Sequence, residues 1–168
     1  ALSGGDLYVG GRFTDTAGIA TADLIAKWNG STWSGLGSNG AGDGALCCGR
    51  VWALAVSGAD LYVGGDFGDA AGIATADHIA KWNGTTWSAL GSNGAGDGAL
   101  SNYVAAVAVS GGNVYAGGAF DDTAGIATAD RIARWNGSTW SALGSNGAGN
   151  GALNSTVSSL AIDGSDLY

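Results

Sequence analysis

The heptapeptide Ala-Gly-Ile-Ala-Thr-Ala-Asp occurs three times without change, at residues 17–23, 71–77 and 124–130. Each occurrence follows an apolar segment that ends in two glycines, first seen as Leu7-Tyr8-Val9-Gly10-Gly11. The second heptapeptide begins 54 residues after the first, and the third begins 53 residues after the second. A fixed period of this length indicates one structural unit that is stacked on copies of itself. We therefore expect three tandem copies of a unit of about 54 residues.

The apolar segments within each copy predict four short β-strands, because they are brief, rich in Val, Trp and Tyr, and bounded by turn residues. Asn29-Gly30 lies between two such segments and predicts a type I′ hairpin turn, while Ser57-Gly58-Ala59-Asp60 predicts a second tight hairpin. No segment shows a helical period with caps. The predicted strands are 51–56, 104–109 and 157–162 as first strands, 6–13 as a second strand, 24–28 as a third and 32–36 as a fourth.

The composition agrees with an all-β, turn-rich chain. Of 168 residues 33 are Gly, none is Pro or Met, and all 14 acidic residues are Asp. Glu, Gln and Met, which favour helices, do not occur, whereas Asp and Gly favour turns. Seven Trp residues and the regular apolar segments indicate a folded core rather than a disordered glycine-rich linker.

A four-stranded meander cannot bury both of its faces alone, and stacking copies around an axis would bury them. We therefore predict one repeat domain over 1–168, built as three four-stranded antiparallel β-propeller blades. A β-helix is the alternative, but the tight hairpins require antiparallel pairing. The predicted blades are residues 1–50, 51–103 and 104–156, followed by a terminal strand in 157–168 that is shared in ring closure.

The double glycine after the second strand, a Trp in the third strand and a Trp opening the fourth make the unit resemble a kelch-type repeat. These residues are Gly10-Gly11, Trp28 and Trp33 in the first copy. The resemblance is to the Gly- and Trp-rich kelch-like repeats of bacterial surface proteins. It implies six or seven blades in a ring, often closed by pairing the first and last strands, and a secreted or cell-surface location.

Three blades are too few for a ring of this kind, since β-propellers have four or more. Ala1-Leu2 matches only the end of a first strand, whereas 157–162 supplies a whole one. We therefore expect the chain to form a homo-oligomer, in which two chains complete one ring, or to be part of a longer propeller chain.

The net charge of −8, with only six Lys and Arg residues, disfavours binding along a nucleic-acid backbone. It also disfavours a polybasic membrane contact, and no apolar segment is long enough for membrane insertion. The expected partner is a glycan or a protein.

The two long loops of each blade are expected on one side of the domain, which makes that side the candidate binding surface. Clustered carboxylates are ligands that Ca²⁺ prefers, so Ca²⁺ is the one metal that this surface suggests. Hydrogen bonds from these side chains to their own turns are the more favoured explanation, and no other cofactor is predicted. The candidate residues are Asp15, Asp23, Asp43, Asp69, Asp77, Asp97, Asp122 and Asp130.

The sequence gives no catalytic set. His78 is the only histidine, and its equivalents in the other copies are Leu24 and Arg131. The adjacent Cys47-Cys48 cannot alone form a structural zinc site, and two loop thiols are favoured over a strained disulfide. Together with Arg50 and Trp52, these are the residues that lack counterparts in the other copies.

We therefore expect a non-catalytic binding or adhesion module that presents its acidic loops to a glycan or protein ligand. The paired Trp residues could stack on sugars, but packing in the core is the favoured role because they alternate along strands. The alternative is a structural repeat that assembles into rings or filaments without a specific small ligand.

Overall fold

The computed structural model describes residues 1–168 as an all-β chain. It contains three antiparallel sheets of four strands, each in sequential order, and one two-stranded hairpin. The first sheet holds β1 (Leu2–Ser3), β2 (Asp6–Gly10), β3 (Ile25–Trp28) and β4 (Trp33–Ser34). The second holds β5 (Val51–Ser57), β6 (Asp60–Gly65), β7 (Ile79–Trp82) and β8 (Trp87–Ala89). The third holds β9 (Val104–Ser110), β10 (Asn113–Gly118), β11 (Ile132–Trp135) and β12 (Trp140–Ala142), and the hairpin is β13 (Ile162–Asp163) with β14 (Asp166–Leu167).

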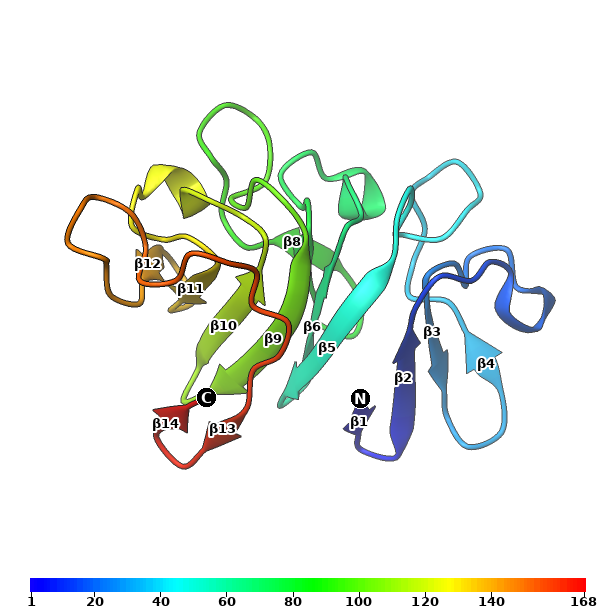
Figure 1. Ribbon diagram of the computed structural model, residues 1–168. Helices are drawn as coiled ribbons and strands as arrows, with labels where there is room; N and C mark the ends of the chain where they lie inside the picture. Colours follow the sequence, from blue (N-terminus) through cyan, green and yellow to red (C-terminus); the bar gives the residue numbers. More distant parts are fainter.

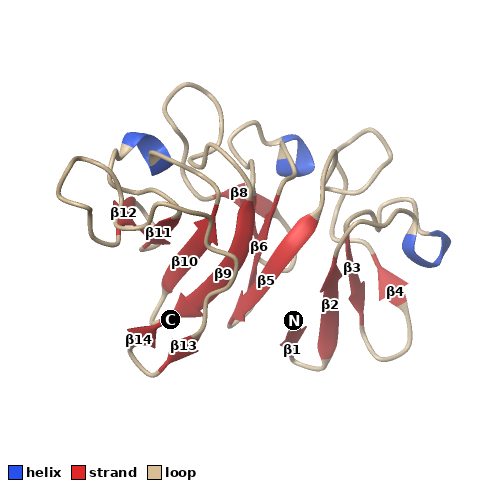
Figure 2. Cartoon of the chain, viewed as in Figure 1, coloured by secondary structure: helices blue, strands red, loops and turns tan.

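The tight hairpins and the long loops lie on opposite sides of this array. Figures 1 and 2 show the three sheets side by side, with the long loops along one side and the hairpin turns and both termini along the other. Three single 3-10 turns lie within the loops, at Thr16–Gly18, Ala70–Gly72 and Thr123–Gly125. None of these turns has the length that a membrane-spanning helix requires.

The second strand ends earlier, and the third strand begins later, than the sequence predicted. The second strand of the first sheet stops at Gly10 rather than at residue 13. The third strand begins after Leu24, because Leu24 adopts a left-handed φ of 59° and its N–H donates to the Phe13 carbonyl. A left-handed residue cannot continue a β-ladder, so this position ends the pairing in every copy.

The predicted type I′ turn at Asn29-Gly30 is wrong. Trp28 pairs with Trp33, so the connection contains four residues, and only Gly30 among them has a positive φ. The Asn29 carboxamide oxygen instead accepts hydrogen bonds from the N–H groups of Ser31 and Thr32, both at 2.9 Å. The same Asn-centred turn recurs at Asn83 and Asn136.

The predicted first strand at 157–162 forms only in part. Its ladder is confined to Ile162–Asp163, with two further backbone hydrogen bonds between Ala161 and Tyr168. The reason is that the neighbouring strand β14 ends at Leu167, so residues 157–160 have no second strand beside them.

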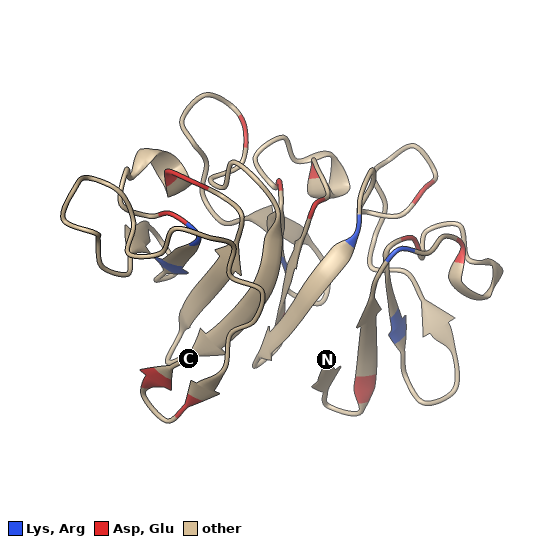
Figure 3. Cartoon of the chain, viewed as in Figure 1, with Lys and Arg blue, Asp and Glu red and all other residues tan.

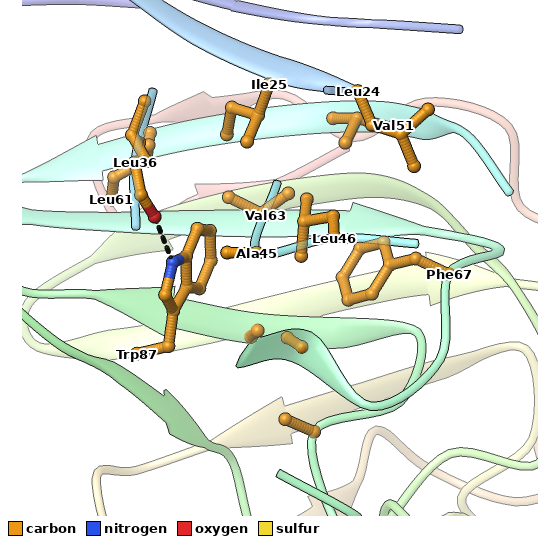
Figure 4. Packing of buried hydrophobic residues seen from close by; sticks show 13 residues of the cluster. Leu24, Ile25, Leu36, Ala45, Leu46, Val51, Leu61, Val63, Phe67 and Trp87 are labelled. Atoms are coloured by element: carbon orange, nitrogen blue, oxygen red, sulfur yellow. Dashed lines mark hydrogen bonds between the residues drawn. The ribbon is translucent and has the colours of Figure 1, made fainter. Parts of the chain in front are cut away.

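Adjacent sheets are joined by apolar cores that contain residues from both. We call the side of a sheet that is turned toward the next sheet its forward face, and the side turned toward the previous sheet its rear face. The joint between the first and second sheets buries the forward residues Ile25, Leu36, Ala45 and Leu46 against the rear residues Leu61, Val63, Phe67 and Trp87 (Figure 4). The joint between the second and third sheets repeats this set with Ile79, Leu90, Ala99, Leu100, Val114, Ala116, Phe120 and Trp140.

A tryptophan hydrogen bond crosses each joint. The indole N–H of Trp87 donates to the Leu36 carbonyl (Figure 4), and that of Trp140 donates to the Leu90 carbonyl. Beside the second joint, Gly64 lies so close to the third sheet that an added Cβ would approach Val104 to 2.7 Å. The first glycine of the pair at the end of this strand is therefore required for close approach of the next sheet.

Candidate functional site

The eight candidate aspartates lie on the loop side of the molecule, where Figure 3 shows most of the acidic residues. They divide into two groups with different roles. In the first group, one carboxylate joins both long loops of its own repeat. Asp23 accepts the N–H of Asp15 at 2.7 Å on one oxygen and the N–H of Gly44 at 3.1 Å on the other. Asp77 and Asp130 make the same two bonds in their repeats.

At Asp130 these bonds favour the ionised carboxylate. The N–H groups of Gly151 and Asp122 lower the pKa of Asp130, and the nearby Arg131 guanidinium lowers it further. The first group is therefore a set of loop clamps, in agreement with the favoured explanation from the sequence.

The second group comprises exposed aspartates whose carboxylates accept no hydrogen bond: Asp15, Asp43, Asp69, Asp97 and Asp122. Asp15, Asp69 and Asp122 adopt left-handed backbone angles just before the 3-10 turns, which Asp tolerates better than most residues. No three His, Cys, Asp or Glu side chains come together in an arrangement that could hold a metal ion.

In the third repeat two candidate aspartates line one cavity. Asp122 and Asp130 lie there with three asparagines and Arg131, around a wholly polar pocket of about 430 Å³. The Arg131 guanidinium lies 3.0 Å from the carboxylate of Asp121 at the same place. Both carboxylate oxygens of Asp130 already accept hydrogen bonds from backbone N–H groups, so this side chain acts as a loop clamp within the pocket.

A different pocket, which the sequence reasoning did not assemble, lies at the first strands of the second and third sheets. It has a volume of about 510 Å³ and contains the largest exposed aromatic side chain of any strand, Trp52, which is 51% exposed. The lining residues are Arg50, Trp52, Asp66, Tyr103, Ala105, Thr156 and Ser158.

A β-bulge places Trp52 in this pocket. Val51 pairs with Gly65 and Ala53 with Gly64, so Trp52 is the extra residue of the strand. The third sheet has the same irregularity, which leaves Ala105 between the paired residues Val104 and Ala106. A bulge redirects a side chain out of the regular pleat, which accounts for a large aromatic side chain that is not packed against a neighbouring sheet.

Polar and aromatic neighbours hold Trp52 in place. The Arg50 guanidinium lies over the indole, 4.7 Å from the ring centroid, and the Tyr103 ring lies 6.4 Å away. Arg50 Nε is also 3.3 Å from a carboxylate oxygen of Asp66, and the Arg50 N–H donates to the other oxygen. The pocket thus combines an aromatic surface with a neutralised ion pair and, on its far side, the hydroxyls of Thr156 and Ser158.

The residues that line the pocket occupy positions at which the copies differ. Arg50, Tyr103 and Thr156 are equivalent to one another, as are Trp52, Ala105 and Ser158, while Asp66 corresponds to Ala119. The sequence signal that could have located the pocket is therefore the set of positions at which the copies differ. Arg50 and Trp52 were recognised as two such positions. It could not show that equivalent positions of successive copies meet in one pocket.

Most of the other tryptophans serve packing. The three Trp pairs have ring centroids 5.4, 5.5 and 5.6 Å apart. Trp87 and Trp140 are buried in the joints, as the core-packing interpretation predicted, and Trp33 is half-buried.

The remaining unusual residues form no nucleophilic or metal-binding set. Cys47 and Cys48 are both free thiols. A hydrogen bond with Cys48 and burial raise the pKa of Cys47 to about 11, which keeps that thiol protonated at neutral pH. His78 is half-buried, and its Nδ1 has no hydrogen-bond partner.

No protein-family model matches the chain, and no curated protein is significantly similar to it.

Proposed function

We propose that the chain is a non-catalytic binding module of a secreted or cell-surface protein, and that the pocket around Trp52 binds a glycan. One observation carries this proposal: a large aromatic side chain, half exposed, is held in a pocket by neighbours that do not bury it. The flat apolar face of an indole packs well against the C–H face of a sugar ring. A ligand of this kind would cover a large aromatic side chain that the protein itself leaves exposed.

The polar groups of the pocket suit sugar hydroxyls. Arg50 and Asp66 offer donors and acceptors, and Thr156 and Ser158 offer hydroxyls that can do both. The positive charge of Arg50 is balanced by Asp66, and the whole chain carries a charge of −8. We therefore propose a neutral rather than an acidic glycan as the ligand.

The arrangement of the sheets supports a finer description of the fold. Three four-stranded sheets are stacked by equivalent joints, with their loops on one side, and the first strands of the second and third sheets line a shared pocket. These features suit blades of a β-propeller of the kelch-like kind. The blade assignment is part of the proposal.

A glycan array followed by titration of the best ligand tests the proposal. Replacement of Trp52 by Ala is expected to weaken binding at least about 10-fold, the equivalent of about 1.4 kcal/mol of lost stacking. Trp52→Phe keeps an aromatic ring and is expected to retain part of the affinity.

The matched control is Asp97→Ala on the loop side, where the carboxylate is exposed and accepts no hydrogen bond. Binding that is lost in Asp97→Ala and kept in Trp52→Ala would move the site to the acidic loops. A folded chain that binds no glycan on the array would favour the alternative, a structural repeat without a small ligand.

A further inference from the structure

The two cysteines of the chain are adjacent and lie where the first repeat carries an extra residue. The first repeat is one residue longer than the second, and the addition falls between Leu46 and Val51. Cys47 is partly buried and Cys48 is exposed, and both are free thiols. A hydrogen bond joins their side chains. The two sulfur atoms are therefore already close together, with no distant segment of chain to bring in.

The Cys47 side chain fastens this segment to the loop that follows β6. Cys47 and Gly68 form an isolated β-bridge, and the Cys47 thiol donates to the Gly68 carbonyl at 3.8 Å. In the next repeat Ser101 takes the place of Cys47, and its hydroxyl donates to the Asp121 carbonyl at 2.9 Å. A donor at this position thus occurs in both repeats, and Cys47 supplies it only while its thiol keeps the proton.

The segment that Cys47 fastens leads directly to the pocket around Trp52. Gly49 lies so close to Asp66 that an added Cβ would approach the Asp66 carbonyl oxygen to 2.5 Å. The N–H of Arg50 donates to the Asp66 carboxylate, and the Arg50 guanidinium lies over the indole. Cys48 has a left-handed φ of 62°, which is uncommon for a residue other than Gly. The position of Arg50 over Trp52 therefore depends on the backbone conformation at Cys48.

A disulfide between adjacent cysteines is strained. Neighbouring Cα atoms are about 3.8 Å apart, whereas disulfides usually join Cα atoms about 4.4–6.8 Å apart. The ring that such a disulfide closes also contains the peptide bond between the two residues, so the backbone must change to accommodate it. Strained and exposed disulfides are reduced more readily than structural ones. A disulfide at this place would therefore form and break reversibly.

We propose that Cys47 and Cys48 are a site of reversible thiol–disulfide exchange, and that their disulfide moves Arg50 away from Trp52. The Cys48 thiolate attacks an external disulfide, binds one half of it as a mixed disulfide and releases the other half as a thiolate. The Cys47 thiolate then attacks the Cys48 sulfur, which forms the Cys47–Cys48 bond and releases the second half. The released thiolates take up the protons that the cysteines lost, so the cysteines are oxidised and the external disulfide is reduced to two thiols.

Exposure and protonation set this order of attack. Cys48 is exposed and is reached first by an external disulfide. A hydrogen bond with Cys48 and burial raise the pKa of Cys47 to about 11, and the charge of a Cys48 thiolate raises it further. The mixed disulfide removes that charge, which favours the second attack. The exchange alters the protein itself, so the pair is not a catalytic set.

Oxidation changes the segment in two ways. It removes the proton that Cys47 donates to the Gly68 carbonyl, and it changes the backbone at Cys48. Because Gly49 is packed against Asp66, the segment has no room to move toward Asp66 and must move away from it. The exchange itself is independent of any glycan, whereas its effect on affinity rests on the proposed function of the pocket.

Treatment with oxidised glutathione followed by mass spectrometry tests the exchange. The unaltered chain should lose one hydrogen atom from each thiol, retain no glutathione and regain both thiols in excess reduced glutathione. Cys47→Ser is the matched control, because Ser is the residue of the second repeat and keeps a donor to the Gly68 carbonyl. Without a second thiol, this variant should hold glutathione on Cys48. An unaltered chain that also holds glutathione there, resists oxidation or forms disulfides between chains would overturn the proposal.

Acrylamide quenching of tryptophan fluorescence tests the movement of Arg50 without a glycan. Oxidation should increase quenching in the unaltered chain, because the guanidinium no longer covers the indole, and Trp52→Phe should abolish the increase. Unchanged quenching in the fully oxidised chain would contradict the link to the pocket.

The affinity for a glycan found on the array should fall about 2- to 5-fold on oxidation and recover on reduction. Equal affinity in both redox states would also contradict the link to the pocket. A chain that shows the quenching change and binds no glycan would refute the glycan site and leave the exchange established.

Discussion

The joints between sheets and the pocket around Trp52 use the repeat in opposite ways. At the joints, most equivalent positions hold the same residue in both joints, as with Trp87 and Trp140 or Phe67 and Phe120. In the pocket they differ completely, as with Trp52, Ala105 and Ser158. The joints bury nearly all of their side chains, whereas the pocket leaves its main aromatic residue half exposed. The positions that repeat therefore lie in the stabilising joints, and the positions at which the copies differ line the candidate site.

The strongest test of this comparison replaces one tryptophan of each kind. Trp87→Ala removes a buried ring and a hydrogen bond across the joint, and we expect a loss of about 3–5 kcal/mol in the free energy of unfolding. Trp52→Ala removes an exposed ring and one cation–π contact, with an expected loss of about 1 kcal/mol or less. Urea unfolding followed by circular dichroism measures both. Equal losses would remove the distinction between joint and pocket.

A second test concerns the loop clamps. Asp77→Ala deprives two backbone N–H groups of their acceptor, and we expect a loss of about 2–4 kcal/mol in the free energy of unfolding. Asp97→Ala removes an exposed carboxylate that accepts no hydrogen bond and should change stability by less than about 0.5 kcal/mol. If excess EDTA lowered the melting temperature of the unaltered chain, a metal role for the loop aspartates would gain support instead.

A third test adds a single methyl group to a joint. In Gly64→Ala the new Cβ would lie 2.7 Å from a Val104 methyl carbon and 2.9 Å from a Val107 methyl carbon, so the sheets must separate. We expect a loss of about 1–3 kcal/mol in unfolding free energy. Ala105→Ser, at the bulge in the pocket, should cost less than about 0.5 kcal/mol because that side chain packs into no joint.

The smallest expected effect is at His78, another position where the copies differ. Burial lowers the pKa of His78, and the nearby Asp77 and Asp66 oppose this only in part. The unfolded chain therefore binds a proton more readily than the folded chain, so stability is full above pH 6.5 and decreases as the pH falls below it.

Replacement of His78 by Leu, the residue of the first copy, should flatten the dependence of unfolding free energy on pH between 8 and 5. The measurement is a set of urea titrations across this pH range. An unchanged slope in His78→Leu would show that other groups cause the dependence.

The repeat made much of the fold predictable. Four antiparallel strands in each copy follow from the alternating apolar segments and tight turns, and the structure confirms the all-β assignment and three four-stranded sheets. The strand ends were not predictable, because they depend on a left-handed residue that is Leu24 in one copy, His78 in the next and Arg131 in the third. Residues so different carry no common signal for that backbone conformation.

The candidate site was predictable only in fragments. The loop position of the aspartates followed from the order of strands, but the clamp role of Asp23 depends on two N–H groups, one of which belongs to Gly44, far along the chain. The pocket required knowledge of which residue bulges out of a strand, and Trp52 in sequence reads as part of an ordinary alternation. Both features depend on contacts between residues that are far apart in the sequence, and residue type alone does not reveal such contacts.

The bulge that holds Trp52 has a consequence for how this scaffold can change. Because the bulged residue stands outside both the ladder and the joints, its identity can be altered without repacking the core, and the chain already tolerates Ala and Ser at the equivalent positions. If the pocket binds a glycan as proposed, combining different residues at these few positions would give modules of the same architecture with different ligand preferences. The repeat thus provides a framework in which recognition can be engineered one side chain at a time.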